Sequence, residues 1–126
     1  MSPDTLRGEP AEVPNLDVPA SQSIVNVRVI DTTTRLQMLV GTMFDPPIKG
    51  HDMLASPSYS FLIEHELLGR KVLFDLGVQK EWQDQAPSTV EMIKEYGWDV
   101  RVEKDVAEIL GDHGVALTTV EAIIWR

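Results

Sequence analysis

The chain has 126 residues, a net charge of −9 and no cysteine. Its 43% hydrophobic and 25% charged residues are ordinary for a globular protein, and its length is enough to bury the core of one domain. The acidic balance disfavours nucleic acid and anionic membrane surfaces as partners, since both are polyanions. The lack of cysteine excludes disulfides, thiol nucleophiles and cysteine-based metal centres.

The first 23 residues are typical of a leader without fixed structure. They combine few large apolar residues with four prolines, and they lack the basic start and apolar run of a secretory signal. No stretch of the chain approaches the roughly 20 apolar residues needed to cross a bilayer. We therefore predict a disordered leader over residues 1–23, one domain over residues 24–126, a cytoplasmic location and no membrane contact.

The first part of the domain indicates strands. Residues 24–30 are rich in valine and isoleucine, with polar residues at alternate positions, and predict a strand. Residues 31–35 predict a turn, and the apolar run over residues 36–43 predicts a second strand. Two prolines and a glycine predict a loop over residues 45–50.

The middle of the chain predicts a hairpin followed by two helices. Residues 59–65 and 71–75 form the hairpin, because the short polar link between them contains glycine. Ser88 is expected to cap the first helix, with Glu91 three residues later, and Gly97 is expected to end it.

The second helix is indicated by apolar residues at helical spacing, which are Val102, Val106, Ile109 and Leu110. Gly111 and Gly114 are expected to end this helix. Residues 120–125 predict a buried strand. The order of strands, helices and a further strand predicts a mixed α/β (α+β) fold.

Few side chains form a recognisable chemical cluster. His51, His65 and His113 are far apart in the sequence, unlike the closely spaced ligands of a zinc site, and we interpret them as surface or loop residues. The acidic residues of the second helix are expected to form a solvated face, and these are Glu103, Asp105 and Glu108. The tryptophans are expected to be packing residues, and these are Trp82, Trp98 and Trp125.

Asp75 and Gly77 are the most informative pair. Asp75 closes an apolar strand, and the glycine shortly after it favours a sharp turn at the edge of a sheet. Two interpretations remain open for Asp75. It has a role in a functional site, or it only accepts hydrogen bonds from backbone N–H groups at the strand end.

Three segments together carry a resemblance to a known family. Residues 58–65, 69–77 and 120–125, with the loop over residues 46–52, resemble the opening half of the metallo-β-lactamase superfamily, in particular its fungal lactonase-like and lactamase-like hydrolases. The resemblance runs from about residue 24 to residue 125. It implies the amino-terminal half of an αββα sandwich, which carries one or two zinc ions at its rim in full-length relatives.

The resemblance also implies a chemistry. The strand matching residues 120–125 leads into a His-x-His-x-Asp-His loop that supplies most ligands of the first zinc. Zinc lowers the pKa of a bound water, and the hydroxide attacks a lactam, lactone or other acyl carbonyl of a small molecule. Asp75 matches an aspartate that shapes the metal site from behind without binding the metal, and Gly77 matches the turn glycine beside it.

The chain departs from the family pattern at Arg126, where that loop is expected to begin. No metal ligand and no complete catalytic set can therefore be assigned, and we expect this chain alone to be a truncated, inactive member. One alternative is a non-catalytic α/β binding or dimerisation module that self-associates through an exposed core face. Another is a small enzyme using His51, Asp52 and Asp75.

Overall fold

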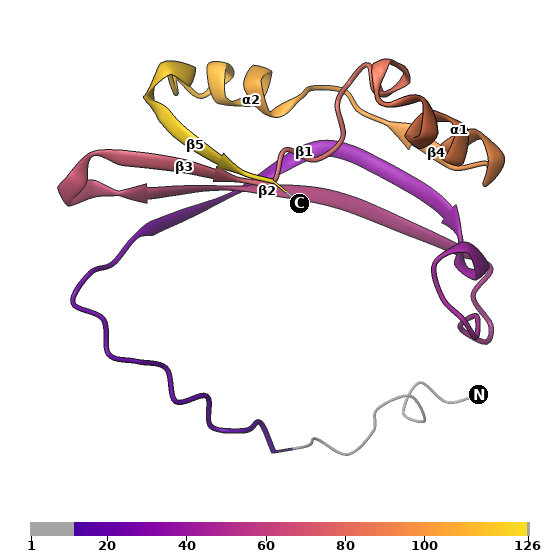
Figure 1. The fold of residues 1–126 in the computed structure, drawn as a ribbon, viewed down its shortest axis with the longest axis horizontal. Coiled ribbons are helices and arrows are strands. Elements are labelled where there is room, and N and C mark those ends of the chain that lie inside the picture. Colours follow the sequence, from indigo (N-terminus) through magenta and orange to yellow (C-terminus); the bar gives the residue numbers. More distant parts are fainter. Residues whose placement is uncertain (1–11, 126) are drawn as a thin grey trace.

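The computed structural model describes residues 12–125 and contains one five-stranded sheet with the strand order β4-β1-β2-β3-β5. Two α-helices lie over one face of this sheet, and no helix of residues 12–125 lies over the other face (Figure 1). The mixed sheet with its helices confirms the predicted α+β fold. Within residues 12–125, no helix is long and apolar enough to cross a membrane.

The leader is described only from residue 12 onward. Residues 12–25 contain no helix or strand and run away from the sheet (Figure 1). Their large side chains Val13, Leu16 and Val18 are exposed. The remaining predicted leader residues lie outside the described part, and the division into a disordered leader and a domain stays a prediction.

Strand β1 (Asn26–Leu39) replaces the two strands predicted over this region. The predicted turn at residues 31–35 is wrong, because the chain there makes an irregularity within one continuous strand. Asp31 pairs with Tyr59 of β2 and Arg35 pairs with Pro57, so the residues between them bulge out of the ladder. Thr33 takes a left-handed backbone conformation with φ 57°, which absorbs the extra length. A short 3₁₀ turn (Val40–Thr42) ends the strand.

Strands β2 (Met53–His65) and β3 (Arg70–Phe74) form the predicted antiparallel hairpin. A 3₁₀ turn (Glu66–Leu68) and Gly69 connect them. β2 begins earlier than predicted, at Met53, with two residues between it and the predicted proline-rich loop. It can do so because its first residues pair with the end of β1, as Met53 does with Leu39.

Helix α1 (Pro87–Glu95) begins one residue before the predicted cap. Ser88 is therefore not the cap, since Pro87, whose fixed φ suits the first helical position, starts the helix after Ala86. Gly97 follows the helix end as predicted, and the Trp98 N–H donates to the Ile93 carbonyl at 3.0 Å. The short strand β4 (Asp99–Arg101), which the sequence did not predict, then pairs with β1.

Helix α2 (Val106–Asp112) is confirmed, but it begins after Val102, and Gly111, which was predicted to end it, lies within it. Asp105 caps it, because its side chain accepts a hydrogen bond from the Glu108 N–H at 2.9 Å. The Glu108 carboxylate accepts from the Asp105 N–H at 3.0 Å in return. After a 3₁₀ turn (Leu117–Thr119), strand β5 (Val120–Ile124) pairs in parallel with β3.

The core lies between the sheet and α2. Its buried members are Ile30 of β1, Leu62 of β2, Leu73 of β3, and Val106 and Leu110 of α2. The prediction that residues 120–125 form a buried strand is wrong, because β5 lies at the edge of the sheet. Trp125, expected to pack, is 72% exposed, whereas Trp82 and Trp98 are half-buried.

Candidate functional site

The turn after β3 brings Asp75 to the carboxyl end of β5. The Asp75 N–H donates to the Ile124 carbonyl at 2.9 Å, and its carboxylate Oδ1 accepts from the Gly77 N–H at 2.9 Å. Asp75 has φ 64°, a left-handed conformation that costs energy for any residue with a side chain. Such an outlier persists only where its surroundings hold it, and functional sites are one place where this occurs.

Gly77 fixes the other side of this turn through a close contact. It has φ 66°, and a Cβ added to it would lie 2.8 to 2.9 Å from three side-chain atoms of Thr32 on β1. Only glycine fits both the backbone conformation and this space. The turn carrying Asp75 therefore rests directly on the bulge of β1.

The bulge also holds the start of α2. The Thr33 hydroxyl donates to the Lys104 carbonyl at 2.9 Å, and it accepts from the Lys104 N–H at 2.8 Å. Lys104 directly precedes the capping residue Asp105. Within the bulge of β1, Thr32 therefore positions the Asp75 turn, and Thr33 positions the start of α2.

Three buried polar side chains lie at this point of the sheet, and sequence reasoning missed them. Thr32, Thr34 and Ser60 are almost fully buried. The Oγ1 atoms of Thr32 and Thr34 are 2.9 Å apart, and Thr32 donates to the Ser58 carbonyl at 2.8 Å. Within the described chain, the Ser60 hydroxyl has no hydrogen-bond partner. These polar residues alternate along their strands in step with the buried Ile30 and Leu62. This alternation is the sequence signal that could have indicated their burial.

The histidines do not meet one another. His51 lies in an exposed loop, the His65 Nδ1 accepts from the Leu68 N–H at 3.3 Å, and the His113 Nδ1 is 2.8 Å from the Ile109 carbonyl. Over residues 12–125 there is no group of three or more histidine, cysteine, aspartate or glutamate side chains that could hold a metal ion.

The suggested set of His51, Asp52 and Asp75 is also not brought together. Asp52 precedes Met53 at the start of β2, while Asp75 follows Phe74, which pairs with Phe61 further along β2. Met53 and Phe61 are separated by about 26 Å, at about 3.3 Å per residue. The structure therefore does not support an active site built from these three residues.

The acidic residues of α2 are accessible to solvent as predicted, with Asp105 half-buried in its capping position. The hydrogen bond from the Asp105 N–H and the contact with Lys80, at 3.2 Å, lower the pKa of Glu108 below its ordinary range. These residues stabilise the start of a helix, and nothing in their geometry indicates catalysis.

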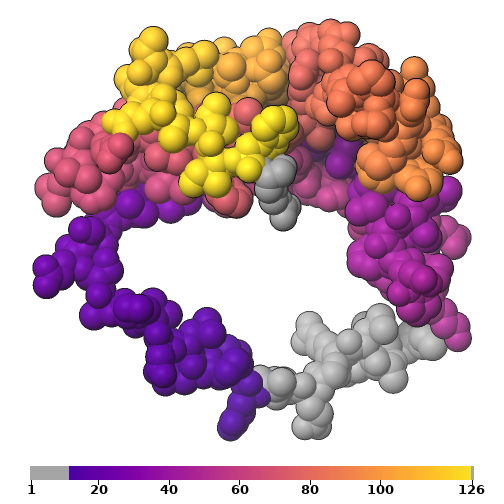
Figure 2. All heavy atoms as spheres, in the orientation of Figure 1, coloured from indigo at the N-terminus to yellow at the C-terminus, as the bar shows by residue number. Residues whose placement is uncertain are grey.

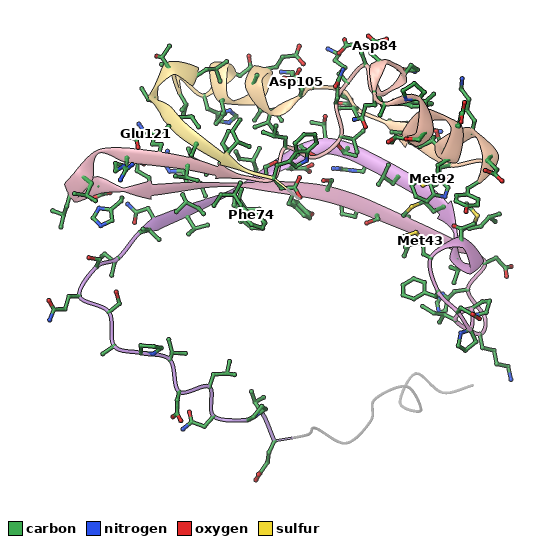
Figure 3. All side chains as sticks on the ribbon, viewed as in Figure 1. Met43, Phe74, Asp84, Met92, Asp105 and Glu121 are labelled. Atoms are coloured by element: carbon green, nitrogen blue, oxygen red, sulfur yellow. The ribbon has the colours of Figure 1, made fainter. Side chains whose placement is uncertain are left out.

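An open, mostly apolar groove of about 880 Å³ lies beside β5, next to the Asp75 turn. Gly77, Ala86, Val106, Leu110, Ile123 and Trp125 contribute to its lining. Polar groups occur at its margin, including Asp105 and Glu121, which both lie on the helix side of the sheet (Figure 3). Glu121 also accepts a hydrogen bond from Arg70 at 2.6 Å, which joins β5 to β3.

The fold and the comparisons together define the class of protein. A mixed sheet with helices on one face and an Asp–Gly turn beside its edge strand is consistent with part of a metallo-β-lactamase fold. Known proteins of related sequence are named as a gamma-lactamase and a metallo-hydrolase, and this similarity supports a fragment of a metallo-β-lactamase-like hydrolase.

The chain is 42% identical over 117 residues to gamma-lactamase FDB1 of Fusarium pseudograminearum (strain CS3096), an alignment that covers 89% of this chain and 28% of that protein. It is 37% identical over 120 residues to metallo-hydrolase mfmC of Annulohypoxylon moriforme, covering 92% of this chain and 31% of that protein. It thus spans less than a third of the length of these relatives. No family model matches the chain, and no solved structure matches it.

The name of a third relative indicates a different class of enzyme. The chain is 37% identical over 123 residues to cytochrome P450 monooxygenase mpaDE of Penicillium roqueforti (strain FM164), covering 94% of this chain and 14% of that protein. The haem of a P450 is held by a cysteine thiolate. Because this chain has no cysteine, the match gives these residues no haem site.

Proposed function

We propose that these residues form part of a zinc-dependent hydrolase that opens a lactam, a lactone or a related acyl bond in a small molecule. The observation that carries this proposal is the similarity to a gamma-lactamase and a metallo-hydrolase over about nine tenths of the chain. A cytoplasmic location belongs to the same proposal and is tested by microscopy of the tagged protein.

The described residues do not fit a metal site by themselves, since they contain no suitable group of ligands. We therefore derive no catalytic step from this chain, and we propose that it is inactive alone. Its proposed contribution is to support a site completed by residues outside those described. β3 and β5 lie side by side, and the hydrogen bond from the Asp75 N–H to the Ile124 carbonyl fixes the end of β5.

Asp75 is proposed as a positioning residue in that site. Its carboxylate accepts from the Gly77 N–H, so the side chain is held at the turn beside the end of β5. In a longer protein with the expected His-x-His-x-Asp-His loop after β5, Asp75→Asn should lower zinc occupancy and hydrolysis together. Asp84→Asn is the matched control, because Asp84 is exposed to solvent on a 3₁₀ turn outside the Asp75–Gly77 turn.

The first test is to sequence the transcript across the codon for Arg126. A reading frame that continues into the histidine cluster is the expected result. The longer product and the 126-residue chain are then compared for bound zinc by elemental analysis, and for hydrolysis of γ-lactams and lactones. We expect zinc and activity only in the longer product. A longer product without metal, or stoichiometric zinc in the 126-residue chain, would contradict the proposal.

A further inference from the structure

The bulge of β1 places two adjacent threonines against two different parts of the molecule. Thr32 lies against Gly77 in the turn after β3, and Thr33 bonds to Lys104 in the segment that leads into α2. Residues 12–25 run away from the sheet and take no part in these contacts (Figure 2). The bulge is therefore a common support for two segments that are far apart in the sequence.

Thr32 cannot yield to pressure from Gly77 by rotating its side chain. Its hydroxyl donates to the Ser58 carbonyl at 2.8 Å and lies 2.9 Å from the Thr34 hydroxyl, and the side chain is almost fully buried. A Cβ on Gly77 would lie 2.9 Å from the Cβ of Thr32, as well as close to the end of the side chain. Because the Cβ moves only with the backbone, a displacement of the turn has to displace the backbone of Thr32.

Thr33 is held on its other side by the segment before α2. Its hydroxyl accepts from the N–H groups of Glu103 at 3.0 Å and Lys104 at 2.8 Å, and it donates to the Lys104 carbonyl at 2.9 Å. Its φ of 57° is unfavourable for a β-branched residue and persists only because these contacts hold it. A shift of the Thr32 backbone therefore acts directly on the hydrogen bonds at the start of α2.

We propose that the bulge is a conformational link, which transmits a displacement of the Asp75 turn to the start of α2 and a loosening of α2 back to the turn. Coupling of this kind acts equally in both directions. A group that orders the Asp75 turn thus also stabilises the cap of α2 at Asp105. The contacts involve no metal and no substrate, so the link does not rest on the proposed hydrolase function.

Two other contacts join the turn to α2, and they have to be separated from the bulge. Leu76 of the turn packs against the core between the sheet and α2. Lys80, which follows the turn, lies 3.2 Å from the Glu108 carboxylate in an exposed ion pair. Glu108→Ala removes this ion pair and loosens the cap of α2, and it leaves the bulge intact. It is therefore the control for both other routes.

The first test is hydrogen exchange on the full 126-residue chain, followed by NMR. In Gly77→Ala, the two amides that bond to the Thr33 hydroxyl should exchange about two- to tenfold faster relative to the Trp98 amide, because their hydrogen bonds are weakened. The Trp98 N–H bonds to a carbonyl of α1 and is the internal reference. Gly69→Ala is the matched control, since Gly69 has φ 62° and no atom within 4 Å of the added Cβ. It should leave the ratio unchanged.

The second test starts from the other end of the link and does not require Gly77→Ala to fold. Thr33→Ala should speed the exchange of the Gly77 amide, which donates to the Asp75 carboxylate, by a similar factor. Thr33→Ser keeps the hydroxyl and should keep the exchange slow. Glu108→Ala should have a clearly smaller effect on the Gly77 amide than Thr33→Ala.

Three results would overturn the inference. An unchanged exchange ratio in Gly77→Ala would mean that the bulge absorbs the displacement. Equal effects of Glu108→Ala and Thr33→Ala on the Gly77 amide would mean that the core or the ion pair carries the link. Exchange in Thr33→Ser as fast as in Thr33→Ala would mean that the hydroxyl has no part in it.

Discussion

The two faces of the sheet carry apolar side chains on the same strands, but only one face is covered. On the helix side, Leu62 and Leu73 are buried against Val106 and Leu110 of α2. On the other side, Val29 and Ile124 remain at least half exposed. A strand in which successive residues are apolar, and not only every second one, is typical of a sheet that is covered on both faces. The difference between the faces therefore shows which apolar side chains the described residues bury and which they leave exposed.

The largest expected effect distinguishes these two faces directly. Leu62→Ala should lower the free energy of unfolding by about 3 kcal/mol, because it removes buried apolar contacts and leaves a cavity. Val29→Ala should cost less than about 1 kcal/mol in the monomer, where the side chain is mostly in water. Urea unfolding at low protein concentration measures both. Similar losses for the two variants would mean that the sheet face carrying Val29 is also buried in the monomer.

The second prediction concerns the turn that rests on the covered face. Gly77→Ala should destabilise the fold by about 2 kcal/mol or more, because it adds a clash with Thr32 to the strain of a left-handed backbone. Gly114→Ala is the control, since Gly114 has φ 72° and no neighbouring atom within 4 Å of the added Cβ. It should cost about 1 kcal/mol. Equal losses in thermal unfolding would show that Thr32 moves aside.

A smaller difference is expected inside the covered face. Thr34→Val removes a hydroxyl that contacts the Thr32 hydroxyl at 2.9 Å, and it should cost about 1 kcal/mol. Ser60→Ala removes a buried hydroxyl without a partner in the described chain, so stability should be unchanged or rise by up to about 1 kcal/mol. Chemical denaturation compares the two variants. A clear loss for Ser60→Ala would reveal a hydrogen bond to a bound water.

The smallest expected effect concerns pH. The pKa of Glu108 is lowered in the folded protein by the Asp105 N–H and by Lys80, so its stabilising effect is present above the pKa of an unfolded glutamate. This effect is lost as the pH falls through the lowered, folded pKa. The pKa of Asp31 is lowered in the same direction by its hydrogen bond with Arg35.

Glu108→Gln should therefore flatten the acid side of a plot of melting temperature against pH. The change should be small, because the contacts are exposed to solvent. Glu91→Gln on α1 removes an equal charge from an exposed position and serves as the control. If the two variants shifted the curve equally, the contacts of Glu108 would have no specific effect on stability.

The elements predicted correctly from sequence depend on local signals. The β2–β3 hairpin follows from a short glycine-containing link, and the helices follow from apolar spacing and terminal glycines. Ser88 failed as a cap because the neighbouring Pro87 had a stronger preference for the start of the helix. The Asp75–Gly77 turn was predictable for the same local reason, since an aspartate and a glycine end an apolar strand.

The features that were missed depend on residues distant in sequence. The bulge at Thr33 exists because Asp31 and Arg35 pair with fixed positions on β2. The strand β4 exists only through its pairing with β1. Thr32 reaches Gly77 across the sheet, so no pattern around Gly77 could indicate this contact. The exposure of β5 follows from its edge position, which its apolar sequence does not encode.

The parallel pairing of β3 with β5 has a consequence for the way this protein is made. β1, β2 and β3 follow one another through residues 40–52 and 66–69, whereas β5 reaches β3 only after the longer segment of residues 75–119 has been added. At a synthesis rate of about 5–20 residues per second, the edge of β3 waits on the order of seconds for its partner strand. During this interval the unpaired backbone of β3 is a template for contact with other nascent chains. We expect the yield of protein to depend on chaperones that act during translation, before β5 has emerged.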